Sequence, residues 1–273
     1  MYAYRLMVHS ERIRDWFDIT AENDWFSILQ IDGLNPPAAT INTSTGGSLD
    51  GTFFNSARLN QRNIVITILP RGDIETNRRR LYTLFPVNQE ILLRFTTGDR
   101  DVTITGYVES FEGSLCDFPQ TFTISIICPR PFFEDHTVST IVLSSTSTDA
   151  PTIRNSGDVK NGVSMRISIS SSLSGEAVRG LTISNYSTEE HITLDMGLIH
   201  NDEIVINTIS GELMAELRRS SYPRPINILK YMTSDSAWLK LKYGENNFAC
   251  TTSNNTGQYV TVTISHINQF VGV

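Results

Sequence analysis

The side chains that could perform catalysis or bind a metal ion are scattered along this chain. Its five histidines include no pair at the H-x-x-x-H spacing that places two ligands on one helix face. His191 follows Glu189 and Glu190, but a solvated charged loop explains this cluster better than a site does. The chain also has no G-x-S-x-G nucleophile elbow and no G-x-x-x-x-G-K-[ST] phosphate loop. The sequence therefore predicts no catalytic residue, no metal site and no cofactor.

Aromatic rings in the second half offer another kind of binding chemistry, the stacking of a sugar on a ring face. Tyr186, Tyr222 and Tyr231 are the candidates, together with Trp238. Trp238 lies in a segment where it alternates with leucines, so a role in a core or a domain contact is favoured for it. A carbohydrate-binding module that contacts a host cell wall therefore stays open as an alternative function.

The cysteines and the N-terminal sequence indicate the compartment. Cys116, Cys128 and Cys250 are an odd number without C-x-x-C spacing. The first ten residues lack the apolar run of a signal peptide, and the longest apolar stretches are too short to span a bilayer. We therefore expect a protein that is made in a cytosol and does not associate with a membrane. Its thiols should be reduced and buried. A Cys116–Cys128 bridge between neighbouring strands is the alternative.

Length and charge limit the class of protein. A chain of 273 residues can hold two domains, and its 40% hydrophobic and 19% charged content is typical of a soluble protein. The net charge is -7; residues 1–135 carry 12 basic and 17 acidic side chains, and the remainder carries 10 and 12. Neither half has the positive excess that nucleic-acid binding requires.

The two halves differ in their basic and aromatic residues. All 12 basic residues before Asp135 are arginine, the first lysine is Lys160, and 17 of the 25 aromatic residues lie in the first half. Arginine and aromatic residues are enriched in protein–protein interfaces, where lysine is depleted. This bias favours an interface in the first half, although codon usage and an aromatic core could also produce it.

The first half has the pattern of strands with one helix. Asp73 can cap the first amides of the helix, Glu75 lies in its first turn, and Pro86 ends it. The sequence of residues 35–51 contains few apolar residues, so it predicts a turn-rich loop. The predicted strands are Tyr4–His9, Trp25–Asp32, Asn63–Leu69, Glu90–Thr97, Asp101–Phe111 and Thr121–Cys128.

A domain boundary follows the last of these strands. Pro129 and Pro131 remove two backbone donors and prevent further pairing. The run Thr137–Thr148 is rich in serine and threonine and has the composition of a connector. We therefore predict a first domain at 1–136, a linker at 137–149 and a second domain at 150–273.

The second half has the pattern of a β-sandwich. Short alternating segments recur there and are separated by turn residues such as asparagine and glycine. The predicted strands are Val163–Ser170, Gly180–Ser184, His191–Leu194, Glu203–Asn207, Glu212–Leu217, Ala237–Lys242, Asn247–Thr251 and Gln258–His266.

An ordered set of short segments resembles the distal tail protein family of long-tailed phages. A strand that ends in an Ile-Cys-Pro-x-Pro-Phe-Phe exit lies midway along the chain, as it does in that family. The helix and the strand before it stand in the family's order. The segments that carry the resemblance are Ile31–Pro37, Leu49–Gly51, Arg58–Pro70, Ile74–Pro86, Ile127–Phe133 and Ser236–Asn246.

The resemblance implies a mainly β protein with a split β-barrel-like first domain carrying one helix and a galectin-like β-sandwich as its second domain. It implies a homo-hexameric ring at the virion tail tip. The implied partners are the tail tube protein, the tail-tip hub protein, which is similar to a tail-associated lysin, and receptor-binding proteins. DNA would pass through the lumen without specific binding, and the ring would be a docking platform rather than an enzyme.

Three consecutive arginines on the predicted helix are the candidates for subunit contacts. Arg78, Arg79 and Arg80 project at intervals of about 100° around a helix, so they cannot all face one core. We expect at least one of them to reach a carboxylate of a neighbouring subunit.

Overall fold

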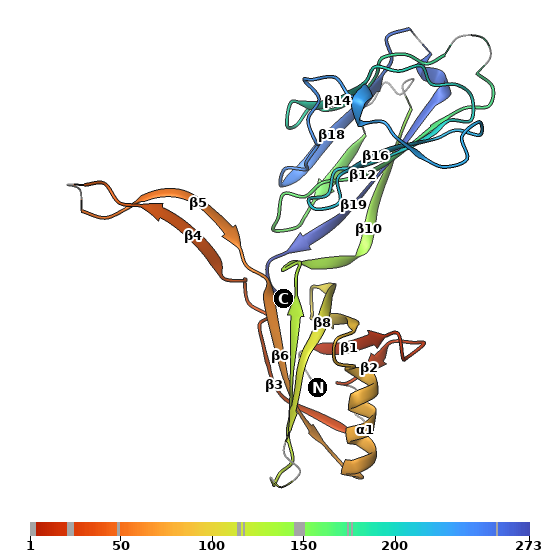
Figure 1. The fold of residues 1–273 in the computed structure, drawn as a ribbon. Coiled ribbons are helices and arrows are strands. Elements are labelled where there is room, and N and C mark those ends of the chain that lie inside the picture. The colour runs from red at the N-terminus through yellow and green to blue at the C-terminus, as the bar shows by residue number, and fades with distance from the viewer. Residues whose placement is uncertain are drawn as a thin grey trace. The chain divides into compact units, whose positions relative to one another are not determined.

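The protein is mainly β, as the sequence predicts (Figure 1). This computed structural model describes residues 4–20, 25–47, 50–113, 116, 118–144, 151–173, 175, 177–254 and 256–273. Its contacts divide the chain into two compact units. Unit 1 is Met1–His136 with Phe270–Val273, and unit 2 is Thr137–Gln269.

The sheet of unit 1 has the order β3-β6-β9-β8-β7-β1-β2. The long strand β8 joins its two parts, because it pairs with β7 through residues 101–107 and with β9 through residues 107–113. Helix α1 (Ile74–Leu84) lies against β1 and β6 and buries Leu81 and Leu84. The strands are β1 (Arg5–Ser10), β2 (Phe17–Asp18), β3 (Phe26–Asp32), β6 (Arg62–Pro70), β7 (Glu90–Thr96), β8 (Asp101–Gly113) and β9 (Phe122–Cys128).

A buried arginine ties separate parts of unit 1 together. Arg62 is only 2% exposed, and its guanidinium lies 4.5 Å from the ring centre of Phe133. It donates to the carbonyl oxygens of Pro131 at 2.9 Å, Asn35 at 2.6 Å and Val271 at 2.7 Å, and also to that of Gly33. These bonds hold the C-terminal residues close to the segment that follows β9 and to the turn that follows β3. Burial lowers the pKa of Arg62.

Gly33 cannot carry a side chain in this arrangement. Its φ is +86°, and a Cβ built there would lie 2.0 Å from the carbonyl oxygen of Asn63. Only glycine adopts this conformation without a steric cost and also allows so close an approach to another backbone.

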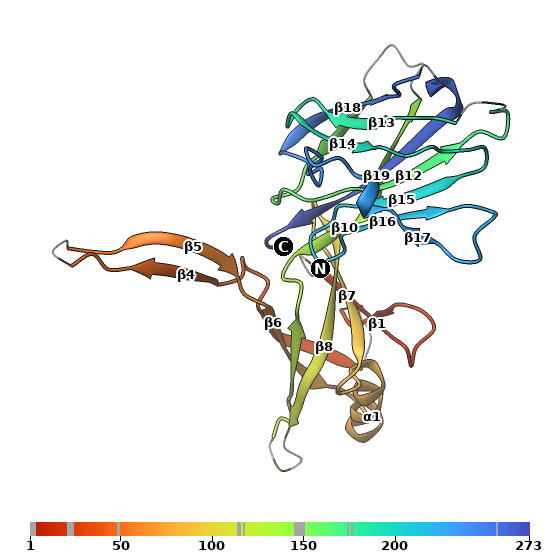
Figure 2. The same ribbon diagram turned by 45° about the horizontal axis from the view of Figure 1, so that its top comes forward.

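The predicted loop at residues 35–51 is wrong. Residues 39–44 form β4 (Ala39–Ser44), which pairs with β5 (Phe53–Leu59). The hairpin extends as an arm from the sheet of unit 1 (Figures 1 and 2). Both strands are largely exposed, so the apolar alternation of a half-buried strand is weak in their sequence. Leu49, in the predicted Asp-Gly loop, lies outside the described residues.

Unit 2 is a sandwich of two sheets that share one core (Figure 2). One sheet has the order β17-β16-β15-β12-β19-β10 and the other has the order β11-β18-β13-β14. Alternate side chains of both sheets, such as Ile167 and Ile183, are buried between them. The strands are β10 (Phe133–Ser144), β11 (Thr152–Asn155), β12 (Ser164–Ile169), β13 (Leu181–Asn185), β14 (Glu190–Leu194), β15 (Glu203–Asn207), β16 (Met214–Arg218), β17 (Ile226–Asn227), β18 (Gly244–Thr251) and β19 (Val260–Phe270).

The predicted linker at 137–149 differs from the structure. Residues 137–144 belong to β10, which pairs with β19, and residues 145–149 lie outside the described residues. Leu143 is buried in the core of unit 2 and Ile141 packs against it. Within residues 137–144, the serines and threonines therefore belong to a strand and not to a connector. The last residues, 270–273, also belong to unit 1, whereas the sequence assigned them to the second domain.

The predicted strand at Ala237–Lys242 is also wrong. Leu239 and Leu241 are fully buried, but the segment forms no continuous ladder with a neighbouring strand: its backbone makes single bonds, such as the one from the amide of Ala237 to the carbonyl of His191 at 2.8 Å. Likewise, the amide of Leu241 donates to the carbonyl of Asn161 at 2.8 Å. The alternating leucines therefore indicate that these side chains are buried, but they do not indicate a β-strand.

The thiols are free and differ in exposure. Cys128 and Cys250 are buried, as predicted, and burial raises the pKa of Cys128 to about 12 and that of Cys250 to about 11. Cys116 is exposed, against the prediction, because it lies outside the strands in the connection between β8 and β9. No disulfide joins it to Cys128.

Candidate assembly surfaces

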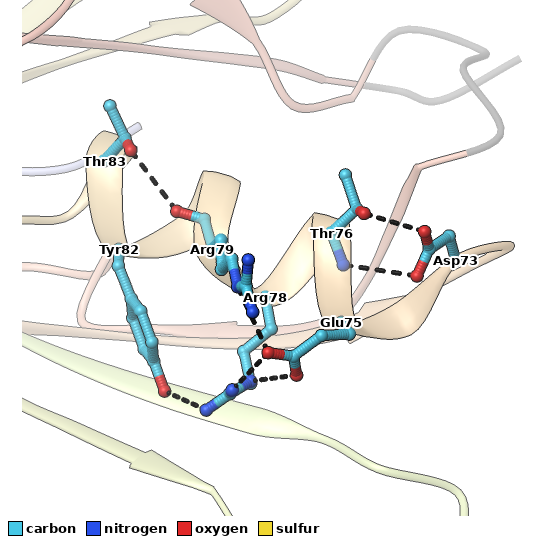
Figure 3. Close-up of polar contacts among 7 residues, drawn as sticks. All are labelled: Asp73, Glu75, Thr76, Arg78, Arg79, Tyr82 and Thr83. Atoms are coloured by element: carbon cyan, nitrogen blue, oxygen red, sulfur yellow. Dashed lines mark hydrogen bonds and ion pairs between the residues drawn. The ribbon is translucent and has the colours of Figure 1, made fainter.

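The start of helix α1 is fixed by local polar contacts (Figure 3). The Asp73 carboxylate accepts from the amide of Thr76 at 3.2 Å and from its hydroxyl at 2.7 Å. These bonds cap the helix as the sequence predicts, and they lower the pKa of Asp73. Asn77 is buried and donates to the carbonyl of Arg71 at 2.6 Å, which fixes the rotation of the helix on the sheet.

Arg78 is occupied within its own helix (Figure 3). Its guanidinium donates to both carboxylate oxygens of Glu75, at 2.9 and 2.7 Å, and to the hydroxyl of Tyr82 at 2.9 Å. This pairing lowers the pKa of Glu75 and raises that of Arg78. Because Nε, Nη1 and Nη2 of Arg78 each donate a hydrogen bond already, this guanidinium has little capacity left for a partner on another subunit.

Arg79 and Arg80 have different surroundings. Arg79 makes one longer contact to Glu75, at 3.2 Å, and its side chain is 75% exposed. Arg80 donates to Asn77 at 3.2 Å, and its guanidinium lies 4.0 Å from the ring centre of Trp25. The structure thus brings Arg78 and Arg79 together at Glu75 and takes Arg80 to another element. Arg79 presents the most available guanidinium of the three.

The arm formed by β4 and β5 has one apolar face and one mainly polar face, on which Phe53 lies opposite Ser44. On the polar face, Asn42 donates to Ser56 at 2.9 Å and Thr40 donates to Asn60 at 2.7 Å. Ser44 continues this row with a bond to Asn55 at 3.3 Å. Side chains join the two strands here, so the polar face stabilises the hairpin itself.

The apolar face of the arm is open to solvent. The cross-strand pairs Ala39–Leu59, Ile41–Ala57 and Thr43–Phe54 lie on this face. Ile41 is 61% exposed, Phe54 is 67% exposed and Leu59 is 43% exposed. Large side chains gathered on one face of a projecting hairpin are typical of an interaction surface. This surface was not predicted, although Ile41 and Phe54 are large apolar residues in an otherwise polar stretch of the sequence.

The aromatic candidates of unit 2 do not form one platform among the described residues. Tyr186 is 61% exposed in the turn between β13 and β14, and Tyr222 is 40% exposed in the connection between β16 and β17. Tyr231 is partly buried against the core, with the Lys230 ammonium 4.8 Å from its ring centre. Trp238 is partly buried and also packs against the core, the role that its sequence pattern favours.

The described residues contain neither a cluster of metal ligands nor a helix that could cross a membrane. Within them, no group of three or more His, Cys, Asp or Glu side chains could hold a metal ion. No helix in the same part of the chain is long and apolar enough to cross a membrane. His191 contacts Asp235 at 3.1 Å on the surface, and not the glutamates that precede it in sequence.

Residues 156–269 match the family described as the siphovirus-type tail component, C-terminal domain. No curated protein sequence matches the chain. Among solved structures, the SPP1 Dit (gp 19.1) protein, described as a paradigm of the hub adsorption apparatus in phages that infect Gram-positive bacteria, aligns with a TM-score of 0.67 at 15% identity. The alignment covers 97% of this chain and 99% of that chain.

Two structures of the phage p2 baseplate in its activated conformation, with Ca and with Sr, align more weakly. Their TM-scores are 0.46 and 0.45 at 11% identity, with 97% and 96% of this chain and 98% of each matched chain covered. The predicted resemblance to distal tail proteins is confirmed by the family match of unit 2 and by the fold shared with SPP1 Dit.

Proposed function

We propose that this chain is a structural component of a phage-type tail tip, in which six copies form a ring between the tail tube and the tail-tip hub. The family match and the shared fold support the tail component. The number six follows from the resemblance alone. The main observation in favour of self-assembly is the exposed apolar face of the β4–β5 arm.

A second copy of this chain is the best occupant for that face. Every copy presents the same arm, so each arm needs a partner surface and each copy can supply one. Such a head-to-tail contact is satisfied for all copies only when the chain of subunits closes into a ring. The arm also contains strand edges, and coverage by a neighbour protects them from unspecific pairing.

Arg79 is the second element of the proposed contact. Its side chain is 75% exposed, and its single ion pair at 3.2 Å lies on the surface, where such pairs are weak. A carboxylate on a neighbouring subunit could therefore replace Glu75 at little cost and form a bidentate pair. Arg78 and Arg80 serve the fold of their own subunit, through Glu75 and Trp25.

The acidic balance of residues 1–135 agrees with a ring around a DNA channel. With 17 acidic and 12 basic side chains, the part that would line the lumen repels DNA and lets it pass without binding. The ring would sit at the virion tail tip and would be built in the host cytoplasm. It would dock the tail tube, the hub and receptor-binding proteins without catalysing a reaction.

Native mass, measured by light scattering on the full chain, tests the assembly. We expect a species near six times the 30.6 kDa of one chain, and its loss in an Ile41→Ser/Phe54→Ser variant that melts like the wild type. Phe53→Ser is the matched control, because Phe53 pairs with Ser44 on the opposite face of the arm. Arg79→Ser should weaken the assembly more than Arg78→Ser.

A ring that forms only on the hub requires a second measurement. Cysteines placed on the arm apolar face should cross-link neighbouring copies in assembled tails. A monomeric mass at every concentration, together with no cross-link in assembled tails, would contradict the proposal.

A further inference from the structure

Unit 2 carries a hollow whose charge is opposite to that of the chain. The hollow has a volume of about 480 Å³ and lies at the connection between β16 and the edge strand β17. Figure 2 shows the course of this connection. Arg218, Arg219 and Arg224 line it, together with Tyr222. Three guanidinium groups around one depression stand out in a protein with a net charge of -7.

Arg219 forms the fixed part of this hollow. It donates to both oxygens of the Asp202 carboxylate, at 2.8 and 2.6 Å, and to the carbonyl of Gly197 at 3.0 Å. Asp202 is 1% exposed, so its charge requires this partner. The same pairing raises the pKa of Arg219. Arg219 is therefore held rigidly, but its charge is already balanced by a buried carboxylate.

The other two guanidinium groups make no such bidentate pair, although Glu203 lies opposite Arg218 in the register of β15 and β16. Glu203 is the carboxylate that lines the hollow, and it pairs with Arg166 on the neighbouring strand β12. Among the described residues, neither Arg218 nor Arg224 has a carboxylate partner in an ion pair. The hollow thus has two cationic groups available for an external anion.

The loop that carries these groups is stiff. Pro223 and Pro225 fix two backbone dihedral angles, and the amide of Tyr222 bonds to the carbonyl of Arg219 at 2.9 Å in a turn. The Tyr222 ring is 40% exposed, and its centre lies 5.7 Å from the Arg219 guanidinium. An aromatic ring on a restrained loop, beside the fixed Arg219, lowers the entropy cost of binding a small ligand.

We propose that this hollow binds an anionic sugar unit, that is, a saccharide residue bearing a phosphate or carboxylate group within a polysaccharide. Arg218 and Arg224 would pair with the anion, and the exposed face of Tyr222 would stack on the sugar ring. The volume lies within the roughly 300–1,000 Å³ of small-ligand sites, whereas protein interfaces of stable complexes are broad surfaces. The proposal does not depend on ring formation.

Binding of defined probes to the purified full chain tests the proposal. Glucose 1-phosphate, glucuronate, glucose and inorganic phosphate can each be titrated by calorimetry and by amide NMR. We expect saturable binding of glucose 1-phosphate or glucuronate that weakens with added salt, and at least tenfold weaker binding of glucose. Comparing the two anionic sugars separates a phosphate from a carboxylate preference.

Variants locate the site and separate it from folding. Arg218→Ser/Arg224→Ser should weaken binding at least tenfold and keep the wild-type melting temperature. Arg154→Ser/Arg179→Ser removes two exposed arginines elsewhere in unit 2 and should change nothing. Tyr222→Ser should lower the affinity for the sugar and leave that for inorganic phosphate unchanged.

Three results would overturn the inference. Equal affinity for inorganic phosphate and the anionic sugars would show an adventitious ion site. Tighter binding of an acidic peptide or of a single-stranded oligonucleotide would assign the hollow to another macromolecule. No binding of either anionic sugar would exclude the proposed ligand class.

Discussion

Replacing Arg62 by methionine is the most direct test of what holds unit 1 together. Methionine has a similar length and can fill the buried space, but it cannot donate a hydrogen bond. The substitution leaves the carbonyls of Gly33, Asn35, Pro131 and Val271 without their donor. It therefore releases three separate chain segments from β6 at once.

The expected loss of stability follows from these contacts. A hydrogen bond to a charged group contributes about 1.5–3 kcal/mol, so four such bonds give a gross loss of about 6–12 kcal/mol. Removing the buried cation also removes its desolvation penalty, which is several kcal/mol. We expect a net loss of about 3–5 kcal/mol in the free energy of unfolding of unit 1.

Urea unfolding followed by tryptophan fluorescence measures this loss. In a Trp238→Phe background, the remaining Trp16 and Trp25 both report on unit 1. Arg58→Met is the matched control, since Arg58 is exposed on the arm, and it should change stability by less than about 0.5 kcal/mol. A loss below about 1 kcal/mol for Arg62→Met would mean that desolvation cancels the hydrogen bonds, and the reasoning would be refuted.

Three further substitutions follow from buried contacts. Gly33→Ala should destabilise unit 1 by about 1–3 kcal/mol or more in urea unfolding, because its Cβ would meet the Asn63 carbonyl at 2.0 Å. Arg219→Met should cost unit 2 about 3–5 kcal/mol in the same assay, because it leaves the Asp202 charge buried without its partner; an unchanged midpoint would contradict this. Burial lowers the pKa of His266, so below pH of about 6.5 the unfolded chain binds a proton that the folded chain does not, and unit 2 should lose stability as the pH falls. His266→Gln should reduce that pH dependence, and an identical pH profile would show that other groups cause it.

Local signals in the sequence predicted local structure well. Helix α1 begins after Asp73 as expected, because a cap and a helical pattern act within a few residues. The pairing of Arg78 with Glu75 also follows from their spacing of three residues, although the sequence analysis did not use it. By contrast, nothing near Arg80 in the sequence indicates Trp25, which is brought there by tertiary structure.

Long-range and exposed features could not be predicted in the same way. The bond from Arg62 to Val271 joins residues 209 positions apart, so no local pattern assigns the C-terminal residues to unit 1. The β4–β5 arm was not predicted because neither of its faces is buried in this chain, so its sequence lacks the apolar alternation of a half-buried strand. In unit 2, Tyr222 was a candidate for its ring alone, whereas Arg218, Arg219 and Arg224, which line the same hollow, were not predicted.

The two faces of the arm solve a problem that any assembling subunit has. A two-stranded hairpin that packs on nothing is marginally stable in water, so it needs internal stabilisation before its partner arrives. The polar face provides this through the side-chain bonds of Thr40, Asn42 and Ser44. The apolar face can then remain exposed without being needed for the hairpin itself. In the proposed ring, a hairpin already ordered in the free subunit loses less entropy on binding, so more of the burial of Ile41 and Phe54 appears as affinity. Assembly should therefore depend on the polar face as well, although no residue of that face has to touch the neighbouring copy.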